Sequence, residues 1–496
     1  MTDVAGKVVD QEVRTGAARP VLILVVASFT AFLGGINMSA LNVALPVLGS
    51  HFDAGTAATT WILLAYLVTM TGTVLVFGRI ADMVGRRKVY LCAMTLFALS
   101  SVVAACATDV WVVIAGRALQ GTAAGMMFAT GGALIASAYS RQRMGAAMGI
   151  FFAVNAVAHV LGPVIGGVVT SGLGWEWLFW LNVPVSLLAL ITGAVVLPRE
   201  SGVASLKRFD VVGGALSFTV IAAIVTGLSP RSALGWADPL TVGSIAVTVL
   251  GIVAFVWWER RVDWPLVDLS KFADRVFRRA NLSTLLNCAV RFPLVLLTAL
   301  MFQTVHDRGP VVAGLVVIPL SVGTMVASMG YGLLERRYTH YALGVAGSVV
   351  TTLGVLVLIP APSNSNFVQL AIVGGGIAGA GAGLLVTANG ATVILGCAPS
   401  DFGAVNSIRS LLQMLGNTIG TAGAVAVLTI PLAAAQRNAV FGGKAADIGV
   451  ESFDALRAGF TTALVVLAVL SLISVIASVA ARPSVSDQLE VSHQRI

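Results

Sequence analysis

The chain has 496 residues, of which 57% are hydrophobic and only 10% are charged, and its mean hydropathy is +0.93. Because soluble domains carry about 25% charged residues, this composition excludes a soluble globular protein and indicates a polytopic membrane protein. The net charge of +8 fits cytoplasmic loops that face anionic lipid. Membrane lipid, and no nucleic acid, is therefore the expected partner of these charges.

Fourteen apolar segments are long enough to cross a bilayer as helices of roughly 20 residues each, which predicts an all-α membrane protein. They lie at residues 21–46, 60–79, 88–106, 110–136, 144–170, 177–197, 211–228, 239–258, 281–303, 311–333, 341–360, 367–396, 403–430 and 457–481. A count of twelve would follow if 211–228 and 239–258 formed one re-entrant hairpin. Each of these two segments is apolar over about 18 residues, which favours two separate spans.

The positions of lysine and arginine support this count. With a cytoplasmic N-terminus, 22 of the 30 basic residues fall in cytoplasmic segments, five in outer segments and three within spans. Cytoplasmic loops of membrane proteins carry such an excess of basic residues. The pattern predicts fourteen spans with both termini on the cytoplasmic side of a plasma membrane.

A weak internal repeat suggests how the spans are grouped. The segment 330–337, Gly-Tyr-Gly-Leu-Leu-Glu-Arg-Arg, follows the span 311–333 much as the charged segment 78–88 follows the span 60–79. Repeats of this kind build transporters from two halves that rock about a central site. The expected domains are a cytoplasmic tail (1–20), a six-helix bundle (21–197), two linker helices (198–258), a cytoplasmic loop (259–280), a second six-helix bundle (281–481) and a cytoplasmic tail (482–496).

The charged segment 78–88 reads Gly-Arg-Ile-Ala-Asp-Met-Val-Gly-Arg-Arg-Lys. Its one carboxylate, Asp82, lies among four cations, and Gly78 and Gly85 would allow a tight turn between two helix ends. One interpretation is a basic anchor on the cytoplasmic side. The other is a conformational latch, in which Asp82 pairs with a basic side chain such as Arg86 or Arg87, or with a helix end, in one state of a moving protein.

Four ionisable side chains lie within spans, where charge is costly and indicates function. They are Arg117, His159, Arg291 and Arg409. Each also has a structural interpretation, as a donor to helix carbonyls, a packed histidine, or a side chain that extends to the membrane surface. All 22 acidic residues fall in loops, tails or span ends. The sequence thus predicts no buried carboxylate, which disfavours a pocket for cations and is unusual for a proton-driven pump.

The fifth span contains the run Gly162-Pro163-Val164-Ile165-Gly166-Gly167. The proline breaks a helix hydrogen bond and can kink the helix. The glycines provide a smooth face for close helix packing. A tightly packed, kinked helix and a role in gating are both compatible with this run.

The sequence shows no signature of an enzyme. It contains no phosphate-binding loop of the form Gly-x-x-x-x-Gly-Lys-Ser/Thr, no paired carboxylates and no cluster of metal ligands. The four cysteines lie in or beside apolar runs and are expected to pack rather than to form disulfides. No enzymatic activity, cofactor or metal is therefore expected.

Taken together, these segments resemble the major facilitator superfamily, and specifically its fourteen-helix drug:proton antiporter branch. Residues 78–88 are similar to the family's loop motif between helices two and three. Arg117 with Gln120 resembles the helix-four motif, whose arginine is implicated in proton transfer. The run Gly162–Gly167 resembles the helix-five antiporter motif, and Trp61 and Tyr66 match the helix-two signature of the branch.

One position departs from this resemblance. The run Asn42-Val43-Ala44-Leu45-Pro46 matches the end of the branch's first-helix motif, which begins with an aspartate nine residues before the proline. Here that position is Asn37. Asparagine can form hydrogen bonds but cannot exchange a proton at physiological pH. Proton coupling would therefore need another group, such as His159, Asp82 or the substrate itself.

The resemblance implies a secondary active transporter that exports hydrophobic or amphipathic compounds by alternating access, coupled to protons, in a bacterial inner membrane. Asn37, Arg291 and Arg409 are expected to face the central cavity, and Trp61, Tyr66 and Met301 are further candidates for its lining. The basic, carboxylate-free interior also favours an alternative, the export or flipping of an anionic amphiphile or lipid. A membrane receptor or scaffold that does not transport is a third hypothesis.

Overall fold

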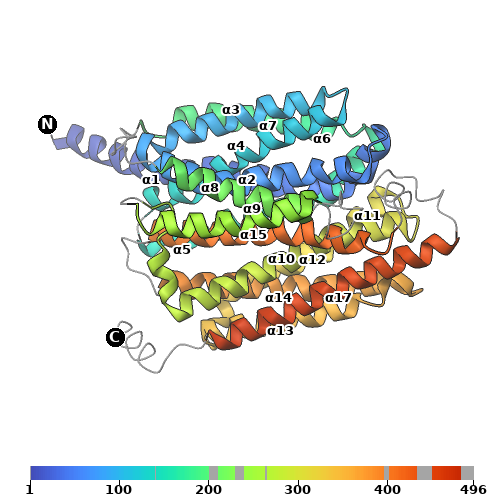
Figure 1. The fold of residues 1–496 in the computed structure, drawn as a ribbon. Coiled ribbons are helices and arrows are strands. Elements are labelled where there is room, and N and C mark those ends of the chain that lie inside the picture. The colour runs from blue at the N-terminus through green and yellow to red at the C-terminus, as the bar shows by residue number, and fades with distance from the viewer. Residues whose placement is uncertain are drawn as a thin grey trace.

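The computed structural model describes residues 2–139, 141–199, 210–228, 239–262, 265–395, 402–432 and 450–481. All regular secondary structure in these ranges is helical, and the long helices run side by side along one common direction (Figure 1). The helices are α1 (Thr2–His51), α2 (Thr56–Val84), α3 (Arg86–Ala105), α4 (Val110–Ala138), α5 (Arg141–Gly172), α6 (Trp177–Trp180), α7 (Asn182–Val196), α8 (Val211–Leu228), α9 (Pro239–Glu259), η2 (Leu269–Ala273), α10 (Arg275–Thr304), α11 (Pro310–Val316), α12 (Ile318–Leu334), α13 (His340–Leu358), η3 (Ala361–Ser363), α14 (Phe367–Leu395), α15 (Phe402–Thr429) and α17 (Val450–Ala480).

Each of the fourteen apolar segments coincides with a helix or with two consecutive helices. Within the described residues, 13 helical stretches are long and apolar enough to cross a membrane. The fourteenth segment lies in α5, whose apolar part, Val157–Gly172, is shorter than a full span by the same measure. The two linker segments form separate helices of 18 and 21 residues, α8 and α9, and both are among the 13.

The charged segment 78–88 was expected to be a loop, and this is wrong. Residues up to Val84 continue α2 and residues from Arg86 begin α3, so Gly85 is the one residue outside a helix. The helix continues because nothing in the sequence breaks it before Gly85, which has φ 101° and ψ 134°. The expected tail 1–20 is likewise helical from Thr2.

The helices form two halves, α1–α7 and α10–α17, with α8 and α9 between them in the chain. Helix α8 packs against both α2 and α15, so the linker pair covers part of the seam between the halves. The start of α1 and the end of α17 lie at the same end of the molecule (Figure 1), which is also the end where α2 meets α3. We call this the Asp82 end.

Bulky side chains mark the outer surface as one that faces lipid. Many leucine, isoleucine and valine side chains are exposed along the helices, among them Leu99, Val195 and Leu250. At the end opposite to Asp82, Trp111 and Trp177 are 55% and 45% exposed. Aromatic residues of this kind gather where a membrane meets water. The chain is a multi-pass membrane protein.

Candidate functional site

The guanidinium of Arg117 lies at the centre of the N-terminal half and is fully buried. Its Nη1 donates to the side-chain oxygen of Asn37 on α1 and, at 2.9 Å, to Gln120 Oε1 on α4. Its Nε donates to the carbonyl of Ile62 on α2 at 3.2 Å. The arginine therefore joins three helices through polar contacts, and none of the described carboxylates is its partner.

The ring of Tyr66 completes this site, which we call the Arg117 cluster: Asn37, Ile62, Tyr66, Ser101, Arg117 and Gln120. The guanidinium carbon lies 4.1 Å from the centre of the Tyr66 ring. A cation over an aromatic face is stabilised by the quadrupole of the ring, most strongly where water is excluded. Tyr66 is itself fully buried, and Asn37 is 6% exposed. The positive charge is thus held by dipoles and a π-face.

Ser101 belongs to the cluster, although sequence reasoning missed it. It accepts a hydrogen bond of 2.7 Å from the side-chain nitrogen of Gln120, which orients the oxygen of Gln120 toward Arg117. Ser101 and its neighbour Ser100 are both buried in α3. A serine pair inside an apolar span is a weak signal, because serines often bond only to their own helix.

The expected cavity positions Asn37 and Tyr66 lie inside this cluster and do not line an open cavity. Met301 is only 2% exposed and Trp61 is half-buried. Asn37 and Tyr66 contact the guanidinium of Arg117 instead, because an unsatisfied guanidinium in an apolar interior is costly in free energy. Gly121, one residue after Gln120, lets α4 approach α2, since a Cβ there would collide with the carbonyl oxygen of Tyr66.

The helix-five run joins the two halves of the molecule. Gly162 and Gly166 lie against Ser39 and Ala40 of α1, where added side chains would collide with them. On another face of α5, a Cβ at Gly167 would stand 2.6 Å from the carbonyl oxygen of Pro310 on α11. Helix α5 is therefore packed against its own half and against the other half at once.

Contacts between the halves lie from the middle of the helices to the end opposite to Asp82. The Gln303 side chain donates to the carbonyl of Val43 at 3.2 Å, and the Thr71 and Thr418 hydroxyls are 2.9 Å apart. The Ser321 hydroxyl reaches the carbonyl of His159 at 3.4 Å. These contacts, together with the packing of Gly167 against Pro310, hold the two halves together at the end opposite to Asp82.

Basic side chains lie along this seam. Arg291 on α10 is half-buried, its Nε has no hydrogen-bond partner, and its charge acts on His159 of α5 across the seam. Arg291 and Arg409 both act on Cys288 as well. The guanidinium of Arg409 is buried and donates to the carbonyl of Val386 on α14 at 3.2 Å, so it does not extend to the membrane surface.

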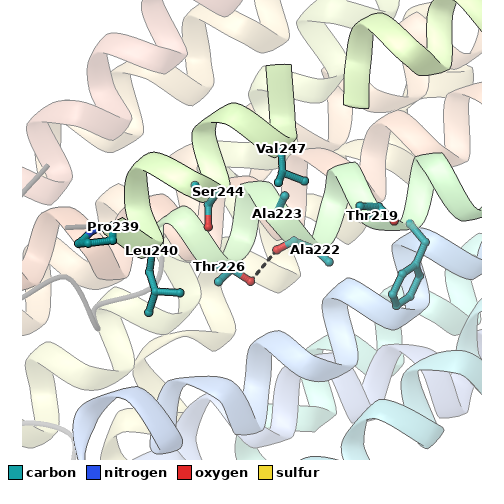
Figure 2. Close-up of a pocket in the computed structure, with 10 residues that line it drawn as sticks. Thr219, Ala222, Ala223, Thr226, Pro239, Leu240, Ser244 and Val247 are labelled. Atoms are coloured by element: carbon teal, nitrogen blue, oxygen red, sulfur yellow. Dashed lines mark hydrogen bonds between the residues drawn. The ribbon is translucent and has the colours of Figure 1, made fainter. Parts of the chain in front are cut away.

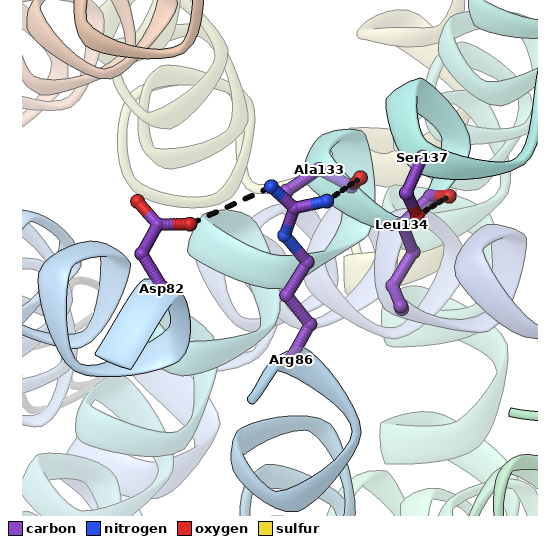
Figure 3. A network of polar contacts seen from close by, with 5 residues as sticks. All are labelled: Asp82, Arg86, Ala133, Leu134 and Ser137. Atoms are coloured by element: carbon purple, nitrogen blue, oxygen red, sulfur yellow. Dashed lines mark hydrogen bonds and ion pairs between the residues drawn. The ribbon is translucent and has the colours of Figure 1, made fainter. Parts of the chain in front are cut away.

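The segment around Asp82 ties helix ends together within the N-terminal half (Figure 3). Asp82 Oδ1 lies 3.5 Å from Arg86 Nη2, and Arg86 Nη1 donates to the carbonyl of Ala133 near the end of α4 at 2.9 Å. Arg87 donates to the carbonyl of Ala194 near the end of α7 at 2.7 Å. The cations thus satisfy carbonyls at helix C-termini, where the helix dipole favours positive charge. Gly78 lies within α2 and has only ordinary contact with α4.

The prediction of no buried and no paired carboxylates is wrong. Asp210 and Glu259, at the start of α8 and the end of α9, are 7% and 4% exposed and lie together. The sequence places both residues at the ends of predicted spans, where side chains are usually hydrated. Here the chain folds back after α9, so that the backbone N–H of Val267 reaches Glu259 Oε2 at 3.2 Å. Hydropathy along the sequence does not reveal such a fold.

A groove of about 410 Å³ lies between α8 and α9 (Figure 2). Its lining is apolar apart from a few hydroxyls, and the Thr226 hydroxyl is already bonded to the Ala222 carbonyl at 2.8 Å. None of its lining residues is charged. The groove therefore lacks the buried charged side chains that the sequence places within the spans.

Two helical halves that close on each other around buried charges define a membrane transporter. The chain belongs to the Major Facilitator Superfamily, whose family pattern matches residues 27–421. It is 30% identical over 418 residues to the multidrug resistance protein Stp of Mycobacterium tuberculosis, covering 83% of this chain and 76% of that one. It is 29% identical over 403 residues to the puromycin resistance protein pur8 of Streptomyces alboniger, covering 80% of each chain.

A third relative is the tetracenomycin C resistance and export protein of Streptomyces glaucescens, with 27% identity over 413 residues, covering 82% of this chain and 75% of that one. Among solved structures, the fold is similar to that of a bacterial homologue of the human lysosomal transporter Spinster, in an inward-facing and unoccupied conformation. The TM-score is 0.61 with 15% sequence identity, and the match covers 94% of this chain and 99% of that chain. This likeness shows the fold alone.

Proposed function

We propose that this transporter is a drug-efflux protein of the fourteen-helix drug:proton antiporter branch, which exports hydrophobic or amphipathic compounds from the cytoplasm by alternating access. The observation that carries the proposal is the seam between the two halves. The halves meet at the end opposite to Asp82, and the basic side chain of Arg291 lies beside this contact. Relatives named for multidrug, puromycin and tetracenomycin C resistance support this substrate class.

The proposed topology has fourteen spans with both termini in the cytoplasm, so that the Asp82 end faces inward. The distribution of lysine and arginine supports it. In this orientation the present structure is closed on the outside. The Asp82–Arg86 pair and the Gly162–Gly167 run would support the conformational cycle, the first by fixing helix ends and the second by letting α5 slide against α1 and α11.

Coupling to protons is part of the proposal, and the Arg117 cluster limits how it works. The amide of Asn37 occupies the place of an exchangeable carboxylate, and it accepts a hydrogen bond from Arg117. In this structure the positive charge of Arg117 is held by neutral groups. A proton must bind elsewhere in the molecule.

A second candidate function is the export of an anionic amphiphile or lipid. It is favoured by Arg291, a half-buried cation at the seam that has an unpartnered Nε and no ion-pair partner among the described residues. An anionic head group would satisfy this guanidinium, since charge-assisted hydrogen bonds to arginine are strong.

Flux through the purified protein in lipid vesicles tests both candidates. One amphipathic dye with a positive charge and one with a negative charge are loaded separately, and a pH gradient is imposed. Gradient-driven flux of the cationic dye supports the first function. Flux of the anionic dye that is lost in Arg291→Ala supports the second. Absence of flux for either dye would leave only a receptor or scaffold role.

A further inference from the structure

Two carboxyl groups lie buried together where α8 begins and α9 ends. Asp210 Oδ1 accepts hydrogen bonds of 2.8 Å from the backbone N–H of Gly213 and from the ring N–H of Trp258. Glu259 Oε2 accepts from the backbone N–H of Val267 at 3.2 Å. One oxygen of each carboxyl is therefore held by fixed N–H donors, which orient the whole group.

The second oxygen of each carboxyl, Asp210 Oδ2 and Glu259 Oε1, is buried and has no hydrogen-bond partner. Both of these oxygens point to the same place beside Gly213. A Cβ added to Gly213 would meet Asp210 Oδ2 and would stand 2.8 Å from Glu259 Oε1. Because glycine has no side chain, both oxygens face the space that a side chain at this position would fill, and the charge of Asp210 acts on Glu259.

Among the described residues, the charged group that acts on Glu259 is Asp210. Arg260 and Arg261 directly follow Glu259, but the guanidinium of Arg261 lies 4.1 Å from the ring centre of Trp257, and no ion pair joins either arginine to the carboxyls. Lys207 and Arg208 lie outside the described residues.

Helices α2 and α15 both pack against α8. On α2, Val76 packs against Gly214, and the charged residues that follow Val76 on this helix are Arg79 and Asp82, of which Asp82 pairs with Arg86. On α15, the guanidinium of Arg409 is turned toward α14.

Two ionised carboxylates in such a place are energetically unfavourable. Like charges at short range repel, and a buried carboxylate oxygen without a donor keeps most of its desolvation cost. One proton removes both difficulties, because it neutralises one group and supplies the donor that the other group lacks. Two buried carboxyl groups that face the same space can share one proton.

We propose that Asp210 and Glu259 form a proton-binding site, in which one proton taken up from water is held between Asp210 Oδ2 and Glu259 Oε1. On uptake, one carboxyl becomes a neutral acid and donates its O–H to the other, which stays ionised. On release, the proton returns to water and both groups are negative. No other reactant is involved.

The site connects parts of the fold that lie far apart in the sequence. Asp210 is bonded to the first turn of α8, Glu259 ends α9, and Val267 belongs to the segment that leads to α10. With the proton bound, these parts are held together. With the proton released, repulsion between the two carboxylates loosens α8, which packs against both α2 and α15.

Infrared spectroscopy of the purified full-length protein in detergent tests the proposal. The wild type at neutral pH is expected to show the C=O stretching band of a protonated carboxyl, and Glu259→Gln and Asp210→Asn are each expected to lose it. The exposed carboxyl of Glu335, on the same side of the membrane, provides the control, because Glu335→Gln should leave the band unchanged.

Thermal unfolding gives a second measurement that does not depend on the band. A site that binds a proton only in the folded state stabilises the protein at low pH, and this stability is lost as the pH rises. Burial raises the pKa of Glu259 from 4.5 to about 7, so the wild type should lose more stability than Glu259→Gln as the pH rises from about 4.5 to about 7. A band that is absent from the wild type or kept in both variants would overturn the proposal, and so would a midpoint that follows sodium or potassium concentration and not pH.

Discussion

The hydrogen bond between Asn37 and Arg117 offers a direct test of how the N-terminal half is held together. Replacing Asn37 by alanine removes the acceptor on α1 and leaves Arg117 Nη1 with Gln120 alone, while Nη2 already has no partner. A hydrogen bond to a charged group contributes about 1.5–3 kcal/mol. Truncation of the side chain adds a packing loss that must be subtracted.

Asn42 provides the matched control for this subtraction. It lies on the same helix, is fully buried, and neither of its side-chain polar atoms has a hydrogen-bond partner. Asn42→Ala thus removes the same atoms without breaking a bond to a charge. We expect Asn37→Ala to lower the free energy of unfolding by about 1.5–3 kcal/mol more than Asn42→Ala does.

The measurement is unfolding of the purified protein in mixed micelles as the fraction of denaturing detergent rises, followed by helix content. The two variants are compared under identical conditions, so that differences in the unfolded state largely cancel. Equal losses in both variants, or a larger loss in Asn42→Ala, would refute the assignment of Asn37 as the partner that stabilises the buried arginine.

Three further predictions concern the turn, the seam and a histidine. Gly85→Ala forces a side chain into a backbone conformation with φ 101°, so we expect a loss of about 1–3 kcal/mol in unfolding experiments; an unchanged midpoint would contradict this. Gly167→Val places side-chain atoms against the backbone of Pro310, so hydrogen–deuterium exchange of α11 should become faster than in Val168→Ala, which changes an exposed neighbour. Burial lowers the pKa of His306 below its ordinary value, and Arg457 and Arg308 act in the same direction. The neutral ring, stacked 3.6 Å from Phe367, therefore contributes stability that is lost as the pH falls below about 6.5, and His306→Phe should remove that loss.

Much of the fold could be predicted because the membrane imposes a simple rule on the sequence. Each span must be apolar over a fixed length, so hydropathy finds the helices. Helix ends were predicted less well, as at residues 78–84, because a helix can continue into water until a residue such as Gly85 ends it. Local sequence carries no signal for that choice other than the glycine itself.

The candidate site was predicted as a set of residues but not as an arrangement. Asn37 and Arg117 are 80 positions apart, and their contact depends on how α1 packs against α4. The burial of Asp210 and Glu259 likewise depends on where the segment after α9 returns. Tertiary packing of this kind cannot be read from the period or composition of one segment.

We expect the two halves, which are closed together at the end opposite to Asp82, to open there during export. Distances between pairs of spin labels test this opening in a variant without native cysteines. The first pair is at exposed positions 173 and 312 near the closed end, and the second pair is at exposed positions 88 and 338 near the Asp82 end. Addition of a transported dye should lengthen the first distance and shorten the second. If both distances stay constant while vesicles of the same protein export the dye, alternating access of these two halves is contradicted.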